Sequence, residues 1–132
     1  MRPATLAEAI ERVIGGEPQG FALSGFLDTF YLAQTAELQL ATLSDRPPPS
    51  GDLRLDALAG AIAEYLARQY ALSRVPEWVF EPNRFLEHAW HVSQLDSPAM
   101  REYLTFASPA EFRSRNIFTE ERPLRRARAK VA

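Results

Sequence analysis

Both histidines of the chain lie in one short stretch together with two carboxylates. The stretch EHAWHVSQLD contains His88 and His91, with Glu87 before them and Asp96 behind them. Imidazole and carboxylate groups are ligands for divalent transition metals. A spacing of three residues brings the two rings to one face only in a helix, and this stretch has no helical period. We therefore predict no metal site, and we interpret the histidines as side chains that form hydrogen bonds at the surface or beside a tryptophan.

The residue patterns that support catalysis are missing from the chain. Catalysis needs a nucleophile with its base, two carboxylates in contrasting surroundings, or a glycine loop that cradles phosphate. The six glycines form no G-x-G-x-x-G, G-x-x-x-x-G-K or G-x-S-x-G pattern. Cysteine is absent, which excludes disulfides, thiolate nucleophiles and cysteine zinc sites. The sequence therefore predicts a protein that is not an enzyme and needs no cofactor.

Aromatic and arginine side chains in the second half are the candidates for contact with a partner protein. Trp78 and Trp90 lie in a proline-containing segment that has no period. A tryptophan in such a segment is either an anchor that packs on the core or the centre of an interface, and both alternatives stay open. The predicted partner-binding residues are Trp78, Phe80, Trp90, Arg113 and Arg115.

The charges of the chain are distributed unevenly. Residues 1–100 carry 7 Lys or Arg and 13 Asp or Glu, whereas residues 101–132 carry 8 and 4, within a net charge of −2. The basic end, residues 122–132, is either a solvated tail or a contact to the phosphates of a nucleic acid. In the second case the nucleic-acid-binding residues are Arg122, Arg125, Arg126, Arg128 and Lys130.

Length and composition predict a single domain with a hydrophobic core. The chain has 132 residues, of which 46% are apolar and 24% are charged. Glu8 and Glu11 lie where a signal peptide would be apolar, and no apolar run is long enough to span a membrane. We therefore expect a cytoplasmic protein without a membrane partner.

Local signals predict two helices near the N-terminus. Thr5, followed three residues later by Glu8, forms a capping box, in which each side chain accepts a backbone N–H of the first turn. A double glycine at residues 15–16 ends the helix that this box starts. Apolar residues at spacings of three and four then predict a second helix over residues 21–33.

A third helix and the longest helix flank a proline-rich linker. Thr35 caps the third helix, whose Leu38 and Leu43 point inward. Three consecutive prolines in the linker, residues 46–51, end that helix because proline cannot continue it. Asp52 then caps the longest helix of the chain, in which apolar residues follow the 3.6-residue period.

Residues 72–96 have neither a helical period nor a strand-like alternation. Pro76 and Pro82 interrupt this segment, and its aromatic residues are irregularly spaced. Long loops without secondary structure are uncommon in compact domains and are usually functional. We interpret the segment as an ordered aromatic loop that lies over the core.

Two serine-proline pairs predict short helices near the C-terminus. Ser97 and Ser108 each precede a proline that suits the first helical position, which predicts helices over residues 98–106 and 109–115. Asn116 tolerates the left-handed conformation and ends the second of them.

These elements together predict an all-α fold, a compact bundle of five to seven helices with a long irregular aromatic loop. The domain covers residues 1–121, with N-terminal helices in 1–45, the linker 46–51, and the long helix, aromatic loop and two short helices in 52–121; residues 122–132 are the basic tail. The predicted core contains Leu6, Ile10, Phe26, Phe30, Leu58, Ile62 and Leu66.

Two stretches of the second half carry a resemblance to a known kind of domain. They are VPEWVFEPNRFLEHAW and, after a spacer, SPAEFRSRNIF. This order of features resembles a domain of uncharacterised proteins of actinobacteria and other GC-rich bacteria. In those proteins the domain follows a repressor-type helix-turn-helix, or forms a short protein encoded beside a nucleotidyltransferase-like toxin. The resemblance covers roughly the last 55 residues and, more loosely, the preceding helix.

The resemblance implies a non-catalytic, antitoxin-like protein. Its partner would be a nucleotidyltransferase-like protein, which it would neutralise by occlusion: an acidic helical body and the aromatic loop would cover a basic nucleotide-binding cleft. No catalytic residue comes with the resemblance. The first 45 residues are needed for the core and leave no separate helix-turn-helix domain. The alternative is a nucleic-acid-binding or transcription-regulatory accessory protein that uses the basic tail.

Overall fold

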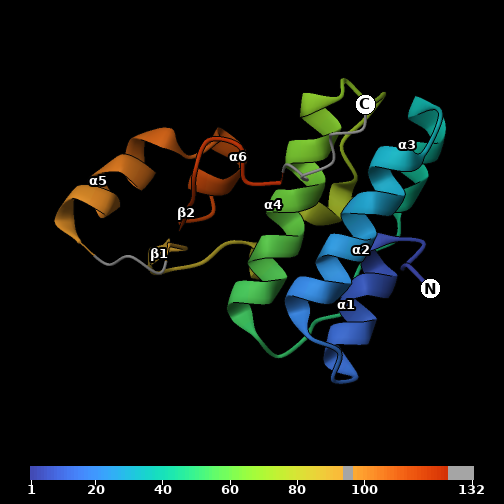
Figure 1. Cartoon of the computed structure of the whole chain (residues 1–132), viewed down its shortest axis with the longest axis horizontal. Helices are drawn as coiled ribbons and strands as arrows, with labels where there is room; N and C mark the ends of the chain where they lie inside the picture. The colour runs from blue at the N-terminus through green and yellow to red at the C-terminus, as the bar shows by residue number, and fades with distance from the viewer. Residues whose placement is uncertain (94–96, 125–132) are drawn as a thin grey trace.

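The structure, a computed structural model, describes residues 1–93 and 97–124. Within them it contains α1 (Leu6–Ile14), α2 (Gln19–Leu32), α3 (Ala36–Ser44), α4 (Leu53–Gln69), the 3₁₀ helices η1 (Glu77–Phe80) and η2 (Pro82–Arg84), β1 (Trp90–His91), α5 (Pro98–Ala107), α6 (Ala110–Arg113) and β2 (Ile117–Phe118). The predicted all-α bundle is confirmed (Figure 1). In the described part of the chain, none of the helices is both long and apolar enough to cross a membrane.

The predicted helix starts are formed by side chains that accept backbone N–H groups. The Thr5 hydroxyl accepts the N–H of Glu8 at 3.0 Å, and a Glu8 carboxylate oxygen accepts the N–H of Ala4 at 2.8 Å. That second bond, with Arg12 beside the carboxylate, lowers the pKa of Glu8. The other N-caps that form as predicted are Thr35, Asp52 and Ser97.

The cap predicted at Ser108 is wrong. The helix α6 is shorter than predicted and has no side-chain cap. The Ser108 hydroxyl is buried and instead accepts the N–H of Thr119 at 2.8 Å, beside the carbonyl oxygens of Leu104 and Thr119. The serine therefore joins the end of α5 to the residue that follows β2. Asn116 does take the predicted left-handed conformation, with φ of 65°.

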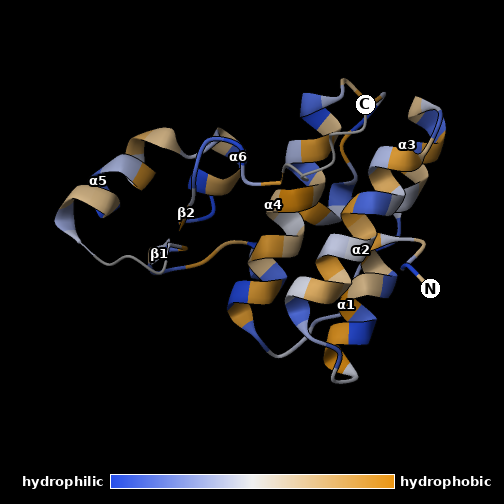
Figure 2. Ribbon diagram, viewed as in Figure 1, coloured by the Kyte–Doolittle hydropathy of each residue, from blue (hydrophilic) through white to orange (hydrophobic). Residues whose placement is uncertain are grey.

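The helix α4 is the centre of the molecule. In Figure 1 it lies between α1, α2 and α3 on one side and α5, α6, β1 and β2 on the other, and it packs against α1, η1, η2 and α6. Figure 2 shows hydrophobic residues along α1, α2 and α4. The predicted core residues Leu6, Ile10, Phe26, Phe30, Ile62 and Leu66 are buried, and Leu58 is partly buried.

Small side chains allow neighbours to approach α4 closely. Five alanines of this helix are buried, namely Ala57, Ala59, Ala61, Ala63 and Ala67. On α3, Leu43 is buried as predicted, but Leu38 is 55% exposed because only one side of this short helix meets the core. The prediction that Leu38 points inward is therefore wrong.

The irregular aromatic segment contains, within residues 72–93, two 3₁₀ helices and one short strand. η1 and η2 each begin directly after or at a proline, which explains why no α-helical period appears there. The strand β1 pairs in parallel with β2, with Trp90 opposite Ile117 and His91 opposite Phe118. The sequence did not predict this ladder, because two residues are too few to form an alternating pattern.

The half-buried phenol of Tyr65 makes the stability of the protein depend on pH in the alkaline range. Its ring packs edge-on against Phe112 with centroids 5.6 Å apart. Burial raises the pKa of Tyr65 above its ordinary value of 10.0, and Tyr70 and Glu111 act in the same direction. The unfolded chain therefore loses this proton at a lower pH than the folded chain, so stability should fall as the pH rises above that ordinary value.

We expect Tyr65→Phe to reduce this alkaline loss of stability. The measurement is the free energy of unfolding in urea at several pH values between about 8 and 11. The control is Tyr103→Phe, because Tyr103 is exposed on α5 and should leave the pH dependence unchanged. Equal alkaline slopes for the wild type and Tyr65→Phe would contradict the expectation.

Candidate partner-binding site

Two of the predicted partner-binding residues lie in the core. Trp78 is 6% exposed, and its indole N–H donates to the carbonyl oxygen of Leu43 at 3.0 Å. Arg115 is 0% exposed and hydrogen-bonded on several sides. Both predictions therefore need correction: Trp78 is the anchor of the aromatic segment, and Arg115 is a structural residue.

The other three predicted residues are accessible, but they do not share one hollow. Phe80 and Arg113 are exposed, and Trp90 is half-buried. Only Trp90 lines one of the clefts described below. For the nucleic-acid alternative, Arg122 is exposed, whereas Arg125, Arg126, Arg128 and Lys130 lie outside the described residues. That alternative stays a prediction.

The two histidines occupy different surroundings. His88 is exposed, and His91 stacks on Phe118 with ring centroids 5.0 Å apart and planes 19° apart. Asp96 lies outside the described residues. Within residues 1–93 and 97–124, no three His, Asp or Glu side chains gather closely enough to hold a metal ion.

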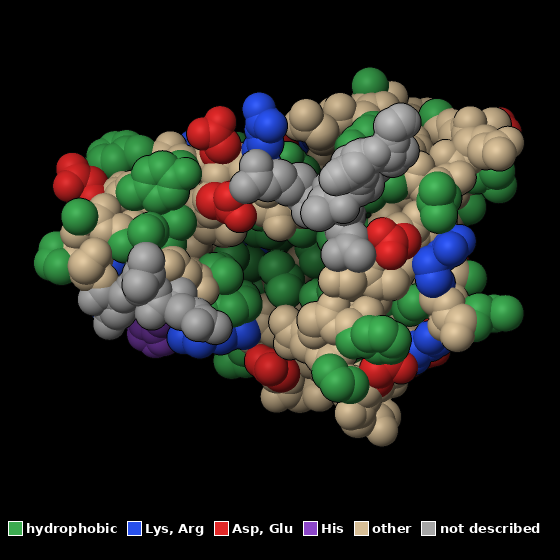
Figure 3. Space-filling view, in the orientation of Figure 1, with side chains coloured by type: hydrophobic (Ala, Val, Ile, Leu, Met, Phe, Trp, Pro, Cys, Tyr) green, Lys and Arg blue, Asp and Glu red, His purple; other side chains and the backbone are tan. Residues whose placement is uncertain are grey.

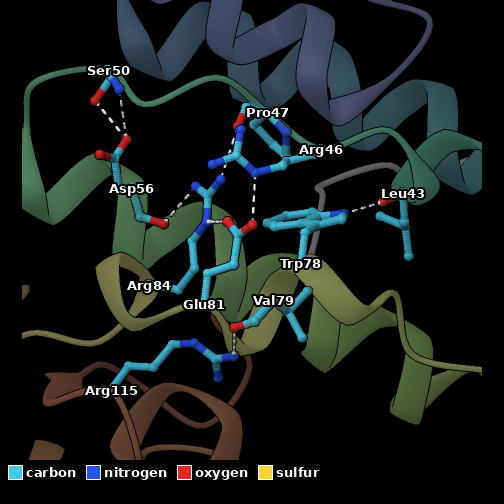
Figure 4. A network of polar contacts seen from close by, with 10 residues as sticks. All are labelled: Leu43, Arg46, Pro47, Ser50, Asp56, Trp78, Val79, Glu81, Arg84 and Arg115. Carbon is cyan, nitrogen blue, oxygen red and sulfur yellow. Dashed lines mark hydrogen bonds and ion pairs between the residues drawn. The ribbon is translucent and has the colours of Figure 1, made fainter.

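The first of two buried arginines ties the aromatic segment to α4 and to the proline linker. Arg84 is 0% exposed, and its guanidinium donates to the carbonyl oxygens of Pro47 at 2.8 Å and Asp56 at 3.3 Å (Figure 4). It also lies over the ring of Trp78, 4.8 Å from the centroid. Burial lowers the pKa of Arg84, and the carboxylates of Glu81 and then Asp56 oppose that shift.

The side chains around Arg84 hold the linker on both sides. Arg46 pairs with Glu81 at 2.7 Å, so the start of the linker is joined to the residue between η1 and η2. At the other end, the Ser50 hydroxyl and backbone N–H both donate to the Asp56 carboxylate, at 2.7 and 3.0 Å (Figure 4). The linker is therefore held against the domain by contacts at Arg46, Pro47 and Ser50.

The second buried arginine joins α6 to α4 and η1. The guanidinium of Arg115 donates to a carboxylate oxygen of Glu64 at 2.6 Å and to the carbonyl oxygen of Val79 at 2.7 Å. A third bond, at 2.8 Å, reaches the carbonyl oxygen of Glu111. The guanidinium lies over the ring of Phe85, 4.5 Å from its centroid. Three separate elements thus meet at one buried cation.

Gly60 makes room for both arginines. A Cβ atom at this position would lie 3.0 Å from Cβ of Arg84 and 3.1 Å from Nε of Arg115. Asp56, Gly60 and Glu64 follow one another at four-residue spacing, so they share one face of α4. This pattern of two acidic residues with a glycine between them, on one buried face, is the sequence signal that could have predicted the burial of two arginines.

The buried arginines position a cleft between the start of α4 and the segment after η1. This cleft has a volume of ≈ 850 Å³ and is lined by Gly51, Asp52, Leu53, Arg54, Pro82, Asn83, Phe85, Leu86, Glu87, His88 and Ala89. Leu53 is 70% exposed, and Phe85 and Leu86 are half-buried. An apolar surface bordered by polar groups is therefore open to solvent.

A second hollow continues the cleft along β1. It measures ≈ 520 Å³ and is lined by Arg54, Ala89, Trp90, His91, Val92, Ser93 and Arg101. Arg54 and Ala89 line both hollows, and the Arg54 guanidinium lies 5.1 Å from the centroid of the Trp90 ring. We call the two hollows together the α4 groove, which has an apolar half at Leu53 and a basic half at Arg54.

A second exposed apolar surface lies on α5. Figure 3 shows hydrophobic side chains gathered over this helix, and the exposed ones include Tyr103 and Phe106. Only Leu104 of α5 is buried.

Comparisons of the chain with protein-family models, curated proteins and solved structures found no match.

Proposed function

We propose that this chain is a non-catalytic interaction protein that binds a partner protein through the α4 groove. The observation that carries the proposal is the apolar half of the groove, where Leu53 is 70% exposed beside Phe85 and Leu86. When a partner covers exposed apolar side chains at the edge of a cleft, their removal from water favours the complex. The buried arginines hold the groove in one shape, which lowers the entropic cost of binding.

The partner we propose is a nucleotidyltransferase-like protein, which this chain neutralises in the manner of an antitoxin. The resemblance of the second half to such proteins supports this partner. The helical body also supports it, because exposed carboxylates at Glu11, Asp45 and Glu77 favour contact with a basic nucleotide-binding cleft. Inhibition would then follow from occlusion of that cleft, without chemistry by this chain.

Co-expression with the product of the adjacent gene tests the proposal. With a tag on one protein only, we expect both proteins to purify together and the partner's nucleotidyltransferase activity to fall in the complex. Leu53→Asp should reduce the recovered partner because it places a charge in the apolar half of the groove. Leu38→Asp is the matched control, since Leu38 is exposed on α3 and does not line the groove.

Two results would contradict the proposal. One is an adjacent gene product that neither binds this chain nor loses activity beside it. The other is equal recovery of the partner with Leu53→Asp and with Leu38→Asp, which would place the interface away from the groove.

A further inference from the structure

We propose that the α4 groove binds an extended segment of the partner, which adds as a third strand to β1 and carries an acidic side chain near an apolar one. The acidic side chain would meet Arg54 in the basic half, and the apolar side chain would cover Leu53 in the apolar half. This inference rests on the proposed function and specifies the chemistry of the segment that is bound.

One edge of β1 faces away from β2, and no described strand pairs with it. The backbone N–H of Trp90 donates to the carbonyl oxygen of Asn116 at 2.8 Å, and that of Val92 donates to Phe118 at 2.9 Å. Because backbone groups alternate in direction along a strand, the N–H and C=O of His91 point to the opposite edge. The sheet contains only β1 and β2 in the described part of the chain. An extended peptide can therefore pair with His91.

The edge of β1 runs along the basic half of the groove. All residues from Ala89 to Ser93 line this half, so a strand that pairs with β1 lies within it. The four steps between these five residues, at about 3.3 Å each, span roughly 13 Å. A longer peptide extends into the apolar half, because Ala89 lines both hollows. Side chains two or four positions apart share one face of a strand, so we expect the acidic and apolar anchors at that spacing.

The charges of the basic half select an acidic ligand. Its lining contains Arg54, and no Asp or Glu among the described residues lines it. The Arg54 guanidinium lies over the ring of Trp90, 5.1 Å from its centroid, and a guanidinium in this position can still bind a carboxylate through its in-plane N–H groups. The Asp52 carboxylate is engaged by the N–H groups of the first turn of α4.

Two other occupants of the groove are less favourable. A second copy of this chain paired edge to edge at β1 would bring two copies of Arg54 together, which is repulsive. A nucleic acid would need an open aromatic face for stacking, but Arg54 covers one face of the half-buried Trp90 ring. The carboxylates of Asp52 and Glu87 at the apolar half would also repel phosphates.

Peptide selection on the full-length protein tests the inference. The probe is a displayed library of random peptides of about nine residues, and the selected peptides are then measured by fluorescence anisotropy. We expect enrichment of peptides in which Asp or Glu lies two or four positions from Leu, Ile or Phe. Arg54→Glu should weaken their binding by roughly tenfold or more through charge reversal. An acidic residue in the first turn of α4 is compatible with the helix dipole, so the fold should be retained.

Matched controls separate the groove from general charge and hydrophobicity. Arg74→Glu reverses another exposed arginine, which contacts Ser44 near the opposite end of the domain, and it should leave binding unchanged. Leu53→Ser should weaken binding, whereas Leu38→Ser should not. Strand pairing has its own readout, because the His91 amide should exchange with solvent more slowly when a peptide is bound.

Each contrary result overturns the inference. These results are a library without enrichment, selected peptides that bind Arg54→Glu as tightly as wild type, and a His91 amide whose exchange is unchanged by peptide. A dimer that depends on Arg54, or a single-stranded oligonucleotide that competes for the groove, would also overturn it. If the partner still co-purifies with Arg54→Glu but is lost with Leu53→Asp, this inference fails while the proposed function survives. If selected peptides bind as described but no adjacent gene product does, the proposed function fails instead.

Discussion

Replacing Arg115 with methionine is expected to lower the free energy of unfolding by about 3–5 kcal/mol, since it breaks a buried ion pair, removes the donor of three hydrogen bonds and leaves Glu64 with only the half-exposed Arg68 as its ionic partner. In the wild type the Arg115 guanidinium bonds a Glu64 carboxylate oxygen at 2.6 Å, and Arg115 is 0% exposed. Methionine fills a similar volume, but its side chain has no hydrogen-bond donor. The carbonyl oxygen of Val79, which accepts from Arg115 at 2.7 Å, also loses its donor.

Urea unfolding followed by tryptophan fluorescence measures this loss. The matched control is Arg113→Met, an exposed arginine two positions earlier, which should change stability by less than about 0.5 kcal/mol. The double variant Arg115→Met with Glu64→Leu should recover part of the loss, because it removes both charges together. It also keeps the test usable if Arg115→Met fails to fold. If the free energy of unfolding of Arg115→Met lay within about 1 kcal/mol of that of the wild type, stability would not depend on the ion pair between Arg115 and Glu64.

Gly60→Ala is expected to destabilise the protein by about 1–2 kcal/mol, although alanine is the better helix former by about 1 kcal/mol. A Cβ atom at position 60 meets Cβ of Arg84 at 3.0 Å, and that atom lies next to the backbone of a fully buried residue. It also meets Nε of Arg115 at 3.1 Å. Neither arginine can withdraw without losing its hydrogen bonds, so the cost of the close contacts exceeds the gain in helix propensity.

Gly20→Ala is the matched control for this substitution. Gly20 lies in the first turn of α2 and is exposed, and nothing lies within 4 Å of an added Cβ. It should therefore be neutral or slightly stabilising. The midpoint of urea unfolding compares the two variants. A Gly60→Ala protein as stable as Gly20→Ala would mean that the two arginines do not need the space above α4.

The helix starts and the fold class follow from the sequence itself. Thr5, Thr35, Asp52 and Ser97 cap helices as predicted, because each such bond joins a side chain to a backbone N–H two or three residues away. The helical period of apolar residues likewise identified part of the core, since six of the seven predicted core residues are buried. Interactions of this range are present in any short segment, so they can be inferred from a single sequence.

Burial could not be inferred from residue type. Ser108 carries the same serine-proline signal as Ser97, yet it is buried beside Thr119 and caps nothing. Arg113 and Arg115 belong to one short turn, and only Arg115 enters the core, because Glu64 and Gly60 on α4 offer it a partner and space. The difference depends on residues far away along the chain.

The α4 groove depends most on tertiary structure. Its walls come from the start of α4, from the segment after η1 and from Arg101 on α5, and no local pattern links them. The sequence by itself determined where the helices begin, which residues are apolar and that the second half contains unusual aromatic residues. Tertiary structure decided that Trp78 is an anchor while Trp90 borders a groove, because only long-range packing, through Leu43 for one ring and Arg54 for the other, distinguishes two tryptophans in one aperiodic segment.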